Sequence, residues 1–226
     1  MVMTDSNYVV WNGVAPGWYR HRHWSRFTAE LSALAARWGR GRLLNVGCAH
    51  GPDFIPFAAG FQLHGVDISP VMLANGRQYA EKQRLEADFT VADAAALPFR
   101  DESFDAAVAV AVYHHLRGEA ARARGFKELY RVLRPGAEAF ITVWNRRQRR
   151  FGWYRREATV IWRQDGQTLA RYHYLYSYRE LQNALRAAGF EVLRLGPEDS
   201  YRGIWSVFSR NVCALVRRPG HHAETP

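Results

Sequence analysis

Two acidic residues and a glycine-containing turn follow successive short apolar runs in the first half of the chain. The turn spans residues 45–51, Asn-Val-Gly-Cys-Ala-His-Gly, and Asp67 ends the next run sixteen residues after Gly51. Asp93 follows the third run. Glycine lets backbone lie close to a ligand, and an acid ending the second strand can accept hydrogen bonds from both ribose hydroxyls. With Asp93 placed to accept from an adenine amino group, this order predicts a site for an adenosine-containing cofactor.

The candidate cofactor-binding residues all come from the ends of these apolar runs and from a fourth run that begins at Phe104. NAD is a rival ligand for such a loop, but its binding motif usually has a third glycine near the start of the following helix. The predicted set is Gly47, Cys48, Ala49, Gly51, Asp67, Ile68, Asp93, Ala94 and Val110.

The elements that must position these residues alternate between short apolar runs and helical stretches, which is typical of βαβ units. Ser69 and Pro70 predict a helix start, and Ser177 with Glu180 forms a capping box for a helix that ends at Gly189. We expect strands at 43–46, 62–66, 88–91, 104–112, 138–143, 190–195 and 205–216, and helices at 52–59, 70–85, 119–133 and 177–189.

Size and composition favour one soluble domain. The chain has 226 residues and 48% hydrophobic residues, and it contains no apolar run long enough to cross a bilayer. The chain has only two cysteines, Cys48 and Cys213, which is too few for a disulfide framework or a four-cysteine zinc site. The N-terminus lacks the features of a secretion signal, so we expect a cytoplasmic location.

The net charge of +10 is divided unevenly along the chain. Residues 1–42 contain six arginines and two acids, and residues 146–226 contain fifteen arginines and seven acids, whereas 43–145 carry a small acidic excess. A polyanionic partner such as nucleic acid would explain this segregation. A genomic bias toward arginine would explain arginine over lysine, but not its distribution.

From about residue 40 to 145 the chain resembles class I S-adenosylmethionine (SAM)-dependent methyltransferases. The matching motifs are Gly-Val-Asp-Ile-Ser at 65–69, Leu-Pro-Phe at 97–99, Asp-Glu-Ser-Phe-Asp at 101–105 and Val-Leu-Arg-Pro-Gly at 132–136. The resemblance implies SAM as cofactor and a doubly wound α/β fold with a seven-stranded, mostly parallel sheet whose last strand is antiparallel. Ala49 replaces the usual middle glycine of the turn, which we expect to be tolerated at negative φ.

Further motifs resemble the tRNA wobble-uridine carboxymethyl methyltransferases, which convert the carboxylate of 5-carboxymethyluridine to its methyl ester. The segment 111–115 resembles that family's Ala-Val-x-His-His, and 171–176, Arg-Tyr-His-Tyr-Leu-Tyr, resembles its Arg-Tyr-Tyr-His segment. Residues 20–24 resemble its Arg-Tyr-Lys-Pro-Trp, without the proline. The resemblance implies tRNA as substrate and a small zinc-binding activator subunit as a partner.

The chemistry of such a reaction needs orientation rather than a base. A carboxylate is already ionised at neutral pH, and an arginine can hold it in a fixed, forked geometry. We expect Arg20 and Arg171 in this role, with His115 and Tyr172 as hydrogen-bond donors in the acceptor pocket, and His114 less so. Either histidine could instead cap the end of a strand.

We expect one methyltransferase domain over 1–216, with a helical N-terminal cap at 1–42, a basic aromatic insertion at 146–175 and a disordered tail at 217–226. The insertion carries Phe151, Trp153, Tyr154 and Trp162 among its arginines. These rings could stack on RNA bases, or they could face the core of an amphipathic lid.

Two other functions stay open at this point. A SAM-dependent methyltransferase of small molecules would share the Leu-Pro-Phe and Asp-Glu-Ser-Phe-Asp motifs. A non-catalytic RNA-binding module that kept the fold is suggested by Ala49, and it would not bind SAM.

Overall fold

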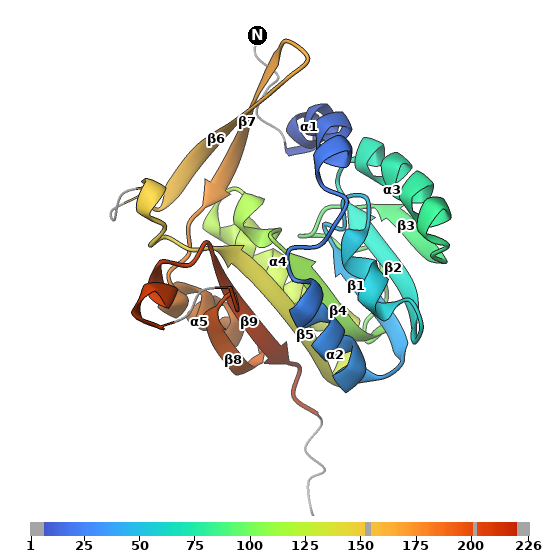
Figure 1. Cartoon of the computed structure of the whole chain (residues 1–226). Coiled ribbons are helices and arrows are strands. Elements are labelled where there is room, and N and C mark those ends of the chain that lie inside the picture. The colour runs from blue at the N-terminus through green and yellow to red at the C-terminus, as the bar shows by residue number, and fades with distance from the viewer. Residues whose placement is uncertain (1–6, 152–154, 201–202, 221–226) are drawn as a thin grey trace, which may run out of the picture.

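One sheet organises the protein in the computed structural model, which describes residues 7–151, 155–200 and 203–220. Its strands run in the order β3-β2-β1-β4-β5-β9-β8, and β9 is antiparallel to both neighbours whereas the other pairings are parallel (Figure 1). This confirms the seven-stranded α/β fold with an antiparallel last strand. The strands are β1 (Gly41–Val46), β2 (Phe61–Asp67), β3 (Ala87–Val91), β4 (Phe104–Val110), β5 (Leu133–Trp144), β8 (Glu191–Pro197) and β9 (Asn211–Arg217).

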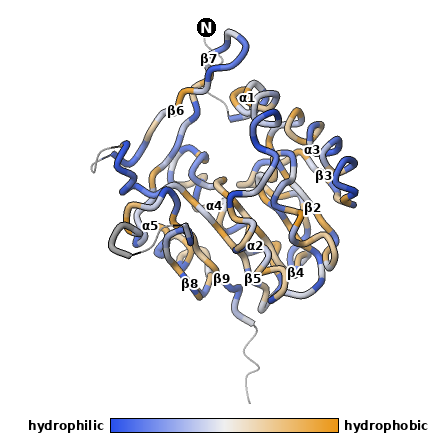
Figure 2. Tube along the Cα trace, viewed as in Figure 1, coloured by the Kyte–Doolittle hydropathy of each residue, from blue (hydrophilic) through white to orange (hydrophobic). Residues whose placement is uncertain are grey.

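Helices cover both faces of the sheet and bury two separate apolar layers (Figure 2). On one face, α4 (Glu119–Val132) and α5 (Tyr178–Ala187) contribute Phe126, Leu129 and Leu185. On the other, α2 (Thr28–Trp38), the short 3₁₀ helix η1 (Pro52–Phe57) and α3 (Pro70–Gln83) contribute buried side chains that include Leu31, Phe54 and Leu73. Burial of apolar area on both sides fixes the register of the central strands.

Two predicted helix starts are confirmed by their hydrogen bonds. The Ser69 hydroxyl accepts from the Met72 amide at 3.1 Å, with Pro70 at the first helical position. In the capping box of α5, the Ser177 hydroxyl accepts from the Glu180 amide and Glu180 Oε2 accepts from the Ser177 amide at 2.8 Å.

The structure corrects several predicted boundaries, among them the start of β5, which begins at Leu133 rather than at residue 138. The expected helix at 52–59 is a 3₁₀ turn that ends at Phe57, where Pro56 lacks an amide for an α-helical bond. Strand β4 ends at Val110 rather than at residue 112, because Ala111 has a φ of 60°. The last strand begins at Asn211, after the 3₁₀ helix η4 (Gly203–Phe208), rather than at 205.

The disordered tail was predicted to begin at residue 217, but the ordered structure continues past this residue. Arg217 is the last residue of β9, and Arg218 Nη1 donates to the Leu133 carbonyl at 2.8 Å. Residues 221–226 lie outside the described residues.

Two segments outside the sheet, α1 (Asn7–His21) and a hairpin, pack against each other. The hairpin comprises β6 (Glu157–Gln164) and β7 (Gln167–Tyr174), in the region expected to be an insertion (Figure 1). A Cβ at Gly13 would lie 2.8 Å from Leu169 Cδ1, and one at Gly17 would collide with the Gln164 side chain. Glycine at both positions therefore lets α1 lie close to the hairpin.

Within the described ranges, no helix has both the length and the apolar character that a membrane span requires.

Candidate functional site

The turn after β1 is built from residues in the left-handed region of backbone space. Gly47 has a φ of 63°, and a Cβ there would lie 2.5 Å from Val112 Cγ2. Ala49 has a φ of 50°, so the negative φ at which we expected alanine to be tolerated is not met. A left-handed alanine places its Cβ near the following carbonyl, at a cost of about 1–2 kcal/mol. The Ala49 amide donates to Asp67 Oδ2 at 3.0 Å, which helps to hold this conformation.

Asp67 lies at the end of β2, where its carboxylate joins two loops. Oδ2 accepts from Ala49, and Oδ1 accepts from the Ser69 amide at 2.9 Å. Burial raises the pKa of Asp67 to about 6, although backbone hydrogen bonds act in the opposite direction. Each oxygen keeps a further lone pair that can accept a hydroxyl proton.

The predicted cofactor residues gather in one pocket at the carboxyl ends of the parallel strands, with one exception. Gly51 does not line it: its α-carbon faces Phe54 and Phe89, and its role is to shape the turn at a φ of 88°. The predicted cofactor-binding residues that line this pocket, together with other residues, are Gly47, Cys48, Ala49, Asp67, Ile68, Asp93, Ala94 and Val110.

This end of the pocket fits an adenosine. Asp67 and Asp93 come from neighbouring strand ends, and Asp93 Oδ1 already accepts from the Ala95 amide at 2.8 Å, which orients its carboxylate. Carboxylates are acceptors for hydroxyl and amino protons, and Gly47 also lines this part of the pocket. These two acceptors could therefore hold the ribose and the adenine of SAM.

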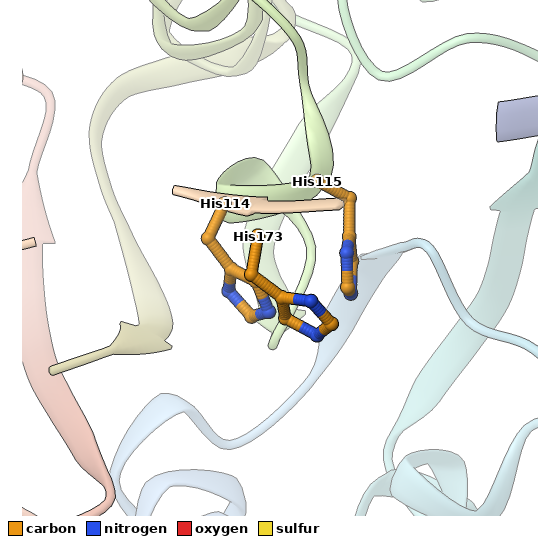
Figure 3. Close-up of side chains that lie close together, drawn as sticks. All are labelled: His114, His115 and His173. Atoms are coloured by element: carbon orange, nitrogen blue, oxygen red, sulfur yellow. The ribbon is translucent and has the colours of Figure 1, made fainter. Parts of the chain in front are cut away.

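Three histidines line the other end of the same pocket (Figure 3). His114 and His115 belong to the 3₁₀ turn η2 (Tyr113–His115) after β4, and His173 belongs to β7. Burial lowers the pKa of all three, that of His115 to about 4, and the Arg171 charge lowers each further. They are therefore neutral at physiological pH. Their ligand atoms lie within 4.8 Å of one another, close enough to hold a metal ion.

Arg171 lines this end of the pocket inside a cage of three indoles. Its Cζ lies 5.8, 5.9 and 5.2 Å from the ring centres of Trp11, Trp18 and Trp162. Its Nε is buried without a hydrogen-bond partner. Burial, followed by the charges of neighbouring arginines, lowers its pKa to about 10, so the guanidinium stays charged at neutral pH. A rigid, poorly solvated cation of this kind suits an anionic ligand.

Two predicted catalytic residues lie outside the pocket. Arg20 is exposed, and its Nη2 pairs with Asp165 Oδ2 at 2.8 Å in the turn of the hairpin. Side chains alternate between the two faces of β7, so Arg171 and His173 face the pocket and Tyr172 faces away from it. On that opposite face the Tyr172 hydroxyl donates to Glu157 Oε1 at 2.7 Å. The Tyr172 carbonyl still contributes, because it accepts from His115 Nδ1.

The aromatic residues of the expected insertion pack against the protein where the structure describes them. Trp162 lies against Trp18 at a ring distance of 5.9 Å, and Phe151 lies 5.8 Å from Trp144. Trp153 and Tyr154 lie outside the described residues.

Sequence reasoning missed several residues that line the pocket. Arg22 follows the end of α1 and lines the pocket, and its guanidinium lies 5.0 Å from the centre of the Trp18 ring. The motif at residues 20–24 therefore predicted an arginine in the correct segment, but Arg22 rather than Arg20 reaches the pocket. Asp53 is half-buried, and desolvation of its carboxylate raises its pKa to about 6, while Ser25 hydrogen bonds to it. No sequence signal marked the other missed residues, which include Trp11, Arg26 and Arg210.

Comparison with known proteins gives consistent matches. A family model described as a methyltransferase domain matches residues 44–141. A putative methyltransferase of Encephalitozoon cuniculi is 31% identical over 200 residues, covering 79% of this chain and 90% of that protein. The tRNA (carboxymethyluridine(34)-5-O)-methyltransferase of Arabidopsis thaliana is 33% identical over 137 residues, which cover 60% of this chain but only 31% of the plant protein.

Solved structures share the fold. A SAM-dependent methyltransferase from Clostridium acetobutylicum superposes with a TM-score of 0.72 at 14% identity, covering 93% of this chain and 99% of that one. A putative methyltransferase in complex with the Trm112 methyltransferase activator of Haloferax volcanii gives 0.71 at 20% identity, covering 97% and 100%.

Asp67→Ala should weaken SAM binding by about 100-fold or more, because it removes the acceptor for the ribose and the bonds that hold Ala49 and Ser69. Calorimetric titration measures this. Asp88→Ala, which removes a largely exposed acid of β3, is the control and should bind SAM normally. An unchanged dissociation constant for Asp67→Ala would mean that the site is misplaced.

Ala49→Gly should stabilise the protein by about 0.5–1 kcal/mol, because relief at positive φ exceeds the entropy that glycine adds to the unfolded chain. Gly47→Ala should destabilise it, because the new Cβ meets Val112. Urea unfolding monitored by circular dichroism measures both changes. A lower midpoint for Ala49→Gly would show that the left-handed alanine carries no strain.

Proposed function

This chain belongs to the class I SAM-dependent methyltransferases, with SAM as its cofactor, and we propose that it methylates the carboxylate of 5-carboxymethyluridine at the wobble position of a tRNA anticodon. The plant relative that carries this activity in its name supports the proposal, as do the arginines around the acceptor end of the pocket.

The division of charge within the pocket matches the two partners of such a transfer. SAM supplies an electrophilic methyl group on a sulfonium sulfur. Asp67 and Asp93 accept from the sugar and the base of the cofactor at one end, and Arg171 receives an anionic acceptor at the other. The three neutral histidines and the indoles around Arg171 keep water away from the ionised nucleophile.

The observation that carries the proposal is a group of like charges around one opening. Arg22, Arg26, Arg171 and Arg210 all line the pocket. After burial, the neighbouring arginine charges lower the pKa of Arg22, Arg171 and Arg210. Among the described residues, none of the four arginines has an acidic side chain within salt-bridge distance. Such mutual repulsion is relieved when an anion binds, and a carboxylate followed by RNA phosphates supplies several.

A carboxylate acceptor also agrees with the weak basicity of the three histidines at this end of the pocket. Because His114, His115 and His173 all have lowered pKa values, they are weak proton acceptors. An amine or a neutral hydroxyl would need deprotonation, whereas a carboxylate is ionised already. The reaction then depends on orientation and on exclusion of water.

An exposed indole beside the opening suits single-stranded RNA. Trp24 is 63% exposed, lines the pocket and lies between Arg22 and Arg26 in the chain. A base next to the modified uridine would stack on this ring while the arginines contact phosphates.

The proposal also includes a small activator subunit, as in the Haloferax volcanii complex that shares this fold.

Incubation with labelled SAM and tRNA from a strain that lacks this gene should label one modified uridine as an alkali-labile methyl ester. Nucleoside analysis before and after mild alkaline treatment identifies the ester. If Arg22, Arg26 and Arg210 each contact one phosphate, tRNA affinity should fall about 20-fold between 50 and 200 mM salt. Affinity that does not depend on salt, with methyl transfer to a small molecule instead, would refute the tRNA function.

Arg171→Ala should lower kcat about 100-fold with little change in SAM affinity, because the guanidinium orients the acceptor rather than the cofactor. Arg20→Ala is the matched control, since it removes an exposed arginine paired with Asp165 outside the pocket and should retain normal turnover. Equal rates for the two variants would show that Arg171 does not hold the acceptor.

A further inference from the structure

We infer that His114, His115 and His173 form a hydrogen-bonding site for the carbonyl and adjacent N–H of the acceptor's uracil ring, an inference that rests on the proposed function. The three side chains come together from η2 and β7, and all three line the acceptor end of the pocket (Figure 3).

The hydrogen bonds of two of these rings fix their tautomers. His115 Nδ1 lies 2.8 Å from the Tyr172 carbonyl, and His173 Nδ1 lies 3.0 Å from the Arg171 carbonyl. A carbonyl oxygen only accepts, so in each neutral ring Nδ1 carries the proton. Nε2 of His115 and Nε2 of His173 are therefore lone-pair acceptors.

His114 has the opposite tautomer. Its Nδ1 accepts from the Trp144 amide at 3.3 Å, so its proton is on Nε2. That Nε2 is buried and has no hydrogen-bond partner, and the whole residue is 0% exposed. A buried N–H without an acceptor costs about 1–3 kcal/mol, which a ligand carbonyl would recover.

A transition metal is the other ligand that three clustered histidines suggest, but the tautomers disfavour it. A metal needs a lone pair from each ring, and His114 offers none, because its Nδ1 is occupied and its Nε2 is protonated. The charges of Arg171 and Arg210, which both line the pocket and bear on His114, would also repel a divalent cation.

The cluster therefore presents one donor and two acceptors, held in place by neighbouring rings. Trp144 stacks on His173 with centroids 3.8 Å apart, and Trp11 contacts His115 edge to face at 4.8 Å. Uracil offers the complementary pair, O4 as acceptor and N3–H as donor, beside the C5 atom that carries the carboxymethyl arm. Cytosine reverses this pair. With the arm held by Arg171, the order of donor and acceptor would select uracil.

The test compares two anticodon stem-loop RNAs, one with 5-carboxymethyluridine and one with its N3-methyl derivative, which lacks the N–H. Wild-type protein should methylate the second with a kcat/KM about 100-fold lower. The His115→Ala variant should methylate the first RNA more slowly than the wild type does. It should also lose most of the difference in rate between the two RNAs, because the His115 Nε2 that would accept from the uracil N3–H is absent from this variant. His21→Ala, which removes an exposed histidine at the end of α1, should discriminate as the wild type does.

The outcomes separate the inference from the proposed function. Equal rates for the two RNAs would overturn the inference alone, whereas no methylation of either RNA would refute the proposed function and the inference with it. The RNA comparison in wild-type protein needs no buried substitution, so it stands even if His115→Ala fails to fold. Tight cobalt(II) binding with d–d absorption, lost in His115→Ala, would also overturn it and would assign the cluster to a metal.

Discussion

The half-buried carboxylate of Asp67 connects the loops on which the cofactor end of the pocket depends. It accepts from the amides of Ala49, in the turn after β1, and Ser69, at the start of α3. Both loops follow adjacent parallel strands, so one side chain fixes the relative position of two strand ends. Because burial raises its pKa, the ionised form is held at a cost, which further hydrogen bonds from a ligand would offset.

The remainder of the pocket depends on the contact between α1 and the β6–β7 hairpin. Gly13 and Gly17 allow the helix to approach the hairpin, which brings Trp11 and Trp18 to one side of Arg171 and Trp162 to another. The same contact brings Arg171 of the hairpin to the pocket that Asp67 and Asp93 line from the ends of β2 and β3. The arginines in this pocket are the basis on which we propose an anionic acceptor.

Alternation along β7 shows how a single residue step changes a role. Arg171 and His173 face the pocket, while Tyr172 between them pairs with Glu157 and offers only its carbonyl to His115. That carbonyl is still important, because it sets the tautomer of the ring. Backbone groups of β7 therefore determine what the histidines present to a ligand, although no sequence motif describes them.

The sequence by itself determined where most strands and helices lie along the chain, the helix caps at Ser69 and Ser177, and the two acids that follow successive strands. These features depend on local periodicity and on the rule that parallel strands end at one edge, so neighbours in the chain suffice to predict them. The tertiary structure alone decided that Arg22 rather than Arg20 reaches the pocket, that Tyr172 faces away, and that Ala49 is left-handed. Each of these depends on packing between segments far apart in the chain, where the partner, rather than the local pattern, selects the direction of a side chain.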